Sequence, residues 1–110
     1  MQPIIQKAIA NLLLQKAQAL LNQPHSHYLG LRLKAQFPED CRNGDIETLA
    51  SMTDLNTSTM RRFMSYNGRL NYQNQQKILK FLEYQNWDVL LIDAVRSISL
   101  EAKILPRDVA

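Results

Sequence analysis

Apolar residues recur at spacings of three and four through most of this chain, the period that gathers side chains on one face of an α-helix. The pattern predicts a long helix over residues 2–22, two short helices that meet near Asp54, and a helix that Asp88 caps and Pro106 stops. Only three Gly and four Pro interrupt the 110 residues. We therefore expect an all-α fold: a compact helical domain with a helix-turn-helix and an extra helix at each end.

The corner near Asp54 is the most specific local signal. The first helix of the pair is expected to start after Asp45, whose carboxylate can accept hydrogen bonds from the free N–H groups of a first turn. Asp54 should end that helix in the left-handed conformation, Leu55 should point back into the core, and Asn56 should cap the second helix. The predicted inner face of the first helix consists of Ile46, Leu49, Ala50 and Thr53.

The second helix, expected over residues 57–66, has an apolar and a polar side. The apolar side carries Thr59, Met60, Phe63 and Met64. The polar side carries Thr57, Ser58, Arg61, Arg62 and Ser65. Because Arg pairs bidentately with guanine and hydroxyls bond to bases or phosphates, this side suits a recognition helix in the DNA major groove. An ordinary amphipathic helix with a solvated polar face would show the same pattern.

The array that runs from Leu49 and Ala50 through Leu55 to Met60 and Phe63 resembles the helix-turn-helix of lambda-repressor-like (xenobiotic-response-element type) transcriptional regulators. Residues 66–69 resemble the loop after that family's recognition helix, residues 71–84 its next helix, and residues 28–37 its first helix. The resemblance covers residues 28–86. It implies a DNA-binding core over residues 24–86, between an N-terminal amphipathic helix (1–23) and a C-terminal helix (87–110) for packing or dimerisation.

The resemblance also assigns DNA contacts by position. Base contacts fall to the start and middle of the recognition helix, and phosphate contacts to the loop that follows, near Gly68. The implied DNA-binding residues are Thr57, Ser58, Arg61, Arg62, Asn67, Arg69 and Lys77. The chain departs from the family at two points: Ile46 stands where a phosphate-binding Gln is common, and Asp54 stands where the turn usually has Gly. Both departures weaken the inference of a standard docking pose.

The distribution of charge agrees with a phosphate-binding face. The net charge is only +3, but residues 55–82 contain five basic residues and no acid. The five are Arg61, Arg62, Arg69, Lys77 and Lys80. A local basic patch of this kind is the electrostatic signature of a surface that binds nucleic acid, although a charge run can also be a solvated face. Double-stranded DNA is therefore the expected partner.

Composition excludes several other classes of protein. No apolar run is long enough to span a membrane, and the single Cys41 cannot form an internal disulfide, so we expect a cytoplasmic protein, nucleoid-associated if bacterial or phage, with no membrane partner. His25 and His27 have no further ligand at metal-binding spacing, so no metal is expected. The three glycines are isolated and no nucleophile motif surrounds the histidines, so we expect no cofactor and no enzyme.

The sequence thus predicts a homodimeric, sequence-specific transcriptional regulator that binds double-stranded DNA. The N-terminal helix can pack on its own domain or pair with a second subunit, and we favour the second arrangement. One alternative is a helical protein-interaction module, in which the helix-turn-helix is a scaffold and the terminal helices bind a protein partner. Another is a non-specific DNA-binding accessory protein.

Overall fold

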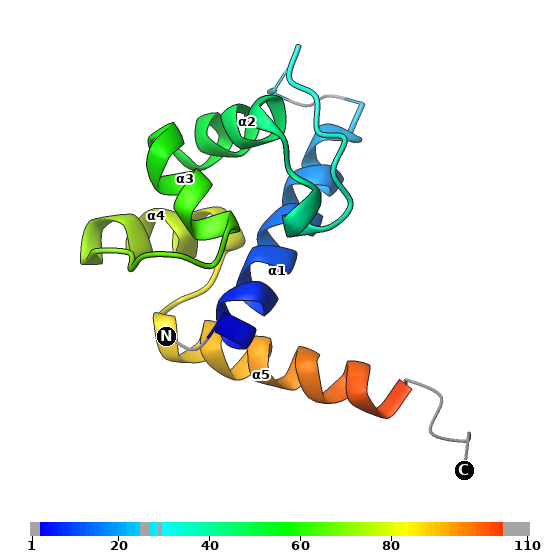
Figure 1. Ribbon diagram of the computed structural model, residues 1–110, viewed down its shortest axis with the longest axis vertical. Coiled ribbons are helices and arrows are strands. Elements are labelled where there is room, and N and C mark those ends of the chain that lie inside the picture. Colours follow the sequence, from blue (N-terminus) through cyan, green and yellow to red (C-terminus); the bar gives the residue numbers. More distant parts are fainter. Residues whose placement is uncertain (1–2, 25–26, 29, 105–110) are drawn as a thin grey trace.

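The part of the chain that the structure describes folds into five α-helices and one short 3-10 helix (Figure 1). The computed structural model describes residues 3–24, 27–28 and 30–104, and within these ranges it contains no strand, which confirms the all-α class. In chain order the elements are α1 (Pro3–Leu21), η1 (Pro38–Asp40), α2 (Asn43–Thr53), α3 (Thr57–Met64), α4 (Tyr72–Leu82) and α5 (Trp87–Ile104). Among the described residues, no helix combines the length and the apolar character needed to cross a membrane.

Helix α1 is the centre of the fold. It runs through the middle of the molecule, with α2, α3 and α4 to one side and α5 across its N-terminal half, and it packs against each of them (Figure 1). Ile9, Ala10, Leu13 and Ala17 are 0% exposed. The apolar face that we expected to pair with a second subunit is therefore covered by the same chain. Packing α1 between the other helices removes its apolar side chains from water, and this burial stabilises the fold.

Residues 31–35 are extended, so the helix expected over residues 28–37 is wrong. Here the sequence alternates strictly between apolar and polar residues, and a period of two belongs to extended backbone. The structure follows that alternation. Leu31, Leu33 and Ala35 are partly or fully buried, whereas Arg32, Lys34 and Gln36 are exposed. The element that packs beside both α2 and α3 is α1.

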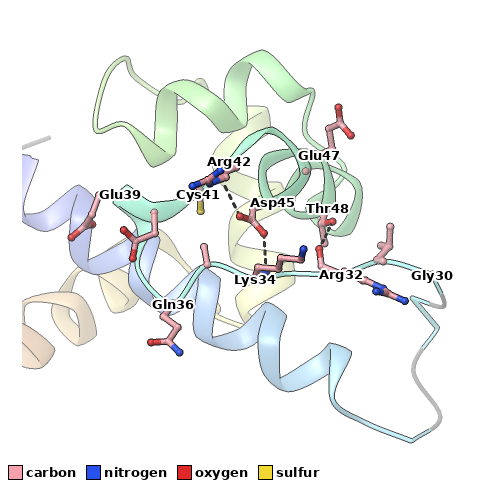
Figure 2. A pocket seen from close by; sticks show the side chains of 14 residues that line it. Gly30, Arg32, Lys34, Gln36, Glu39, Cys41, Arg42, Asp45, Glu47 and Thr48 are labelled. Atoms are coloured by element: carbon pink, nitrogen blue, oxygen red, sulfur yellow. Dashed lines mark hydrogen bonds between the residues drawn. The ribbon is translucent and has the colours of Figure 1, made fainter.

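Two side chains of α2 hold this extended segment in place (Figure 2). Asp45 is buried, and its carboxylate accepts hydrogen bonds from the backbone N–H groups of Lys34 at 2.8 Å and Arg42 at 3.1 Å. Thr48 Oγ1 donates to the carbonyl oxygen of Arg32 at 2.8 Å. Side chains therefore satisfy backbone groups that a sheet neighbour would otherwise satisfy.

We expect Asp45→Ala to lower the free energy of unfolding by about 1–3 kcal/mol, because two N–H groups lose their acceptor in a partly buried site. Urea denaturation followed by circular dichroism measures this loss. Asp40→Ala is the matched control, since Asp40 is exposed on η1 and should change stability by no more than about 0.5 kcal/mol. Equal, small losses for both variants would contradict the role given to Asp45.

Helix α5 differs from its predicted register. Asn86, rather than Asp88, caps it, and Asn86 Oδ1 accepts from the Val89 N–H at 2.9 Å. The residues that face α1 are Leu90 and Ala94, each fully buried. The helical spacing of Leu91, Val95, Ile98, Ala102 and Leu105 predicts one apolar side for this helix, but Leu91 and Ile98 are half-buried and Val95 is exposed. The remaining two, the side chain of Ala102 and the whole of Leu105, lie outside what the structure describes.

Candidate nucleic-acid interface

The turn between α2 and α3 has the geometry predicted from its residues. Asp54 ends α2 in the left-handed conformation, with φ 62° and ψ 31°. Leu55 is buried in the core. The side chain of Asn56 caps α3, because its Oδ1 accepts from the backbone N–H of Thr59 at 2.7 Å. These local interactions fix the angle at which α3 leaves α2, and so the direction in which its outer side faces.

Helix α3 separates an apolar from a polar side, as predicted. Met60, Phe63 and Met64 are buried in the core. Ser58, Arg61, Arg62 and Ser65 are exposed, while Thr57 is half-buried. The helix ends at Met64, two residues before the predicted end. Four of its eight residues and the C-cap Ser65 therefore form a polar surface that carries two guanidinium groups and three hydroxyls.

Arg61 lies beside the start of α2. Its Nη2 donates to Asn43 Oδ1 at 3.3 Å. Helix α2 begins at Asn43, so the prediction of a start after Asp45 is wrong by three residues. Ile46, at the position where the resembled family often has Gln, is buried in the core. The exposed amide at the start of α2 is thus Asn43, and the guanidinium of Arg61 keeps further N–H donors for another acceptor.

A second polar feature, which we call the arginine hollow, lies at the C-terminal end of α3. It measures about 210 Å³ and is bordered by the end of α3, the loop over residues 67–70 and the start of α4. Its polar lining comprises Thr59, Arg62, Asn67, Arg69, Asn71 and Asn74. Two guanidinium groups, amide side chains and a helix N-terminus are the groups that bind phosphate in proteins.

Three residues of the arginine hollow were not predicted from the sequence: Thr59, Asn71 and Asn74. Asn71 caps α4, since its Oδ1 accepts from the Asn74 backbone N–H at 2.8 Å. An Asn with a second polar residue three positions later, just before an apolar helical pattern, is a helix-start signal that could have placed both residues at this edge.

Two residues with positive φ shape the loop after α3. Gly68 has φ 83°, a conformation that favours glycine, and the aliphatic part of Arg62 lies beside it. Tyr66 has φ 62° and is held by its hydroxyl, which donates to Glu39 Oε2 at 2.8 Å. Lys7 Nζ lies 3.6 Å from the other carboxylate oxygen of Glu39. This chain of contacts ties the end of α3 to η1 and α1.

The hydroxyl of Tyr66 holds the pKa of Glu39 below its ordinary value of 4.5. We expect Tyr66→Phe to raise that pKa towards 4.5, measured by NMR titration of the Glu39 side chain. Because the folded-state pKa is the lower one, the contribution of Glu39 to stability is present above pH 4.5 and is lost as the pH falls through the folded-state value. Tyr72→Phe is the control, and an unchanged Glu39 titration in Tyr66→Phe would contradict the contact.

Lys77 lies apart from the arginine hollow. Its Nζ donates to the backbone carbonyl of Asp54 at 2.9 Å and lies 3.7 Å from the Asp54 carboxylate. Lys77 therefore braces α4 against the turn before α3. The structure brings Arg62, Asn67 and Arg69 together, places Arg61 beside Asn43 at the start of α2, and leaves Lys77 at the turn between α2 and α3.

Comparison of the chain with protein-family models, curated proteins and solved structures found no match. The role of this surface is therefore inferred from its residues and their geometry.

Proposed function

We propose that this protein is a sequence-specific transcriptional regulator that binds double-stranded DNA by placing α3 in the major groove. The observation that carries the proposal is the continuity of two surfaces: the exposed polar side of α3 adjoins the arginine hollow at its C-terminal end. A groove about 12 Å wide admits one helix. With α3 in the groove, Ser58 and Arg61 meet base edges, while Arg62, Asn67 and Arg69 meet the phosphates that flank it.

Electrostatics support the same orientation. Residues 55–82, which include the whole of α3, the loop and α4, contain no acidic side chain. The two acids that flank this segment have basic partners, since an Asp54 carboxylate oxygen lies 3.7 Å from Lys77 Nζ and Glu83 Oε2 lies 2.7 Å from Lys16 Nζ. The surface that would face DNA is therefore cationic without competing carboxylates on the same segment.

The dependence of DNA affinity on salt tests this proposal. Fluorescence anisotropy with a labelled duplex should give a logarithmic plot of affinity against salt with a slope of about −2 to −3 per protomer, since each phosphate contact contributes about −0.9. Arg62 and Arg69 are the expected phosphate contacts and account for about −2, and the guanidinium of Arg61 at a base edge adds at most one further displaced counterion. Absence of measurable binding to any duplex at low salt would overturn the proposal.

The proposed regulator acts as a homodimer through the outer side of α5. Val89, Ile92 and Val95 follow one another at a spacing of three, and Ile92 is 55% exposed. We call these residues the α5 strip. The apolar face of α1 is buried within the chain, whereas the α5 strip is an apolar helix face that is exposed and can meet a second copy. Two-fold pairing would place two recognition helices on half-sites about one turn of DNA apart.

Ile92→Glu is expected to shift the protein from dimer to monomer, because a carboxylate placed at the centre of an apolar contact must be desolvated. Sedimentation velocity measures this change. Phe37→Glu is the control, as Phe37 is an exposed apolar residue that precedes η1, away from α5. A wild-type protein that is monomeric at about 100 μM, a concentration well above the dissociation constants of specific dimers, would contradict dimerisation through α5.

A helical protein-interaction module is the second candidate function, and the α5 strip is the observation that favours it. In that case α5 would bind a protein of another kind, and the helix pair would serve as a scaffold. The salt titration of DNA affinity distinguishes the two functions. A DNA-binding regulator loses affinity as salt rises, whereas a scaffold makes no phosphate contacts and releases no counterions.

A further inference from the structure

A second hollow, larger and more apolar than the first, lies on the other side of the loop over residues 68–70. It shares Phe63, Gly68, Arg69 and Leu70 with the arginine hollow and is completed by residues of α1, α4 and α5. We call it the tryptophan cavity, after Trp87. Its volume is about 640 Å³, within the range of about 300–1,000 Å³ that accommodates small ligands.

The walls of the tryptophan cavity are mainly apolar. Ile5 comes from α1, Phe63 from α3, Leu70 from the loop, and Trp87 and Leu91 from α5. Trp87 is half-buried, and one part of its indole packs on the core while another borders the cavity. A ligand with an aliphatic or aromatic body would bury its own apolar surface and that of the cavity walls.

Two glutamines supply hydrogen-bond acceptors to the cavity. Gln6 is 4% exposed, and its Nε2 donates to the Phe63 carbonyl at 3.1 Å. Gln75 Nε2 donates to the Leu70 carbonyl at 3.2 Å. The two amide oxygens make no hydrogen bond to the described residues and can each accept one from a ligand, while each amide nitrogen keeps a second N–H. The cavity can therefore hold a ligand that carries N–H donors.

Arg69 supplies the charge. It is exposed and is the one ionisable side chain among the residues that line the tryptophan cavity. A guanidinium group at the edge of an apolar cavity pairs with a carboxylate in a bidentate manner. Apolar walls, two amide oxygens and one guanidinium together match a molecule with an apolar body, an ammonium group and a carboxylate.

We infer that the tryptophan cavity binds a free apolar α-amino acid, with its ammonium group on the oxygens of Gln6 and Gln75, its carboxylate on Arg69, and its side chain against Trp87 and Leu91. Because Arg69 also borders the arginine hollow, the bound carboxylate competes with a DNA phosphate for the same guanidinium. The ligand therefore lowers DNA affinity. This second step rests on the proposed function, whereas ligand binding itself does not.

Ligand binding is tested first, without DNA. Trp87 is the only tryptophan of the chain, so its fluorescence reports directly on the cavity. Titration with L-leucine, L-methionine and L-phenylalanine should give a saturable change for at least one of them, with a dissociation constant of about 1 mM or lower. Phenethylamine, which lacks the carboxylate, and 3-phenylpropionate, which lacks the ammonium group, should each bind about tenfold or more weakly than L-phenylalanine. No saturable change with any of the three amino acids up to about 10 mM would overturn the inference.

Two variants locate the binding site. Leu91→Phe narrows the cavity and should weaken binding about tenfold or more, whereas Ser51→Phe, at an exposed position of α2, should leave it unchanged. Arg69→Gln should retain the fold and bind L-phenylalanine and phenethylamine equally, because only the carboxylate contact is lost. Equal binding by wild type and Leu91→Phe, both folded by circular dichroism, would place the ligand elsewhere and overturn the inference.

The coupling to DNA is tested with the same ligand at saturation. We expect a loss of DNA affinity of about 3- to 10-fold and a salt slope smaller in magnitude by about one, as for the removal of one phosphate contact. Unchanged DNA affinity with the cavity filled would overturn the competition at Arg69. Failure of the ligand-free protein to bind DNA would instead count against the proposed function, and the fluorescence titration would be unaffected.

Discussion

Arg61→Ala is expected to weaken binding to the preferred duplex by about 10- to 100-fold and to remove the preference at one base pair. Arg61 lies on the exposed side of α3, and Asn43 already holds its guanidinium at the start of α2. A positioned guanidinium loses little conformational entropy when it pairs with a base edge. Competition between duplexes that differ at single positions measures both effects.

Arg69→Ala should behave differently, because Arg69 lies in the arginine hollow and meets the phosphate backbone. It should weaken all duplexes to a similar degree and reduce the magnitude of the salt slope by about one. Arg32→Ala is the charge-matched control, since Arg32 is exposed on the extended segment away from α3. Uniform losses on every sequence for both Arg61→Ala and Arg69→Ala would contradict the assignment of Arg61 to base recognition.

Phe63→Ala is expected to lower the free energy of unfolding by about 3–5 kcal/mol, a large fraction of the total for a domain of this size. Phe63 is 2% exposed and lies among the largest buried side chains. Its carbonyl oxygen also accepts the hydrogen bond from Gln6, so α1 and α3 meet at this residue through both packing and a polar contact. Urea denaturation followed by circular dichroism measures the loss.

Tyr72→Ala is the matched control for Phe63→Ala, because Tyr72 is also aromatic but is 72% exposed at the start of α4. Its replacement should change stability by no more than about 0.5 kcal/mol. Similar losses for the two variants would mean that α3 is not anchored in the core through Phe63.

Features set by neighbouring residues could be predicted from the sequence. The left-handed Asp54 and the Asn56 cap depend on a few adjacent side chains and backbone groups, and both were predicted. The buried side of α3 follows from the helical period alone. The polar side of the candidate interface was predicted for the same reason, since it is the complement of Met60 and Phe63.

Features set by distant contacts could not be predicted in the same way. The sequence predicts α1 as an appended amphipathic helix. Only the structure shows that α2, α3, α4 and α5 all pack against it. Helix α2 starts earlier than predicted because Asp45 caps it from the third helical position, where its carboxylate accepts from the N-cap Arg42 N–H and also from the Lys34 N–H of the extended segment. The alternation of apolar and polar residues over 31–36 is typical of extended backbone, whereas the helix predicted there came from the resemblance to a helical family.

The candidate interface was incomplete for a similar reason. The arginine hollow forms only when the loop brings α4 against the end of α3, so the contribution of Asn74 depends on tertiary contact. Lys77 carries the charge expected of a phosphate contact, but its Nζ lies at the carbonyl of Asp54. The distribution of charge along the sequence therefore predicts the basic segment, whereas tertiary contacts determine which of its cations contact the protein itself and which line the hollow.

Selection from a random duplex library with the purified full chain is the most direct test of sequence-specific DNA recognition by α3. We predict enrichment of one discrete motif, arranged as an inverted repeat with half-sites about one helical turn apart. Retained DNA without any enriched motif, or no retained DNA at low salt, would contradict the account.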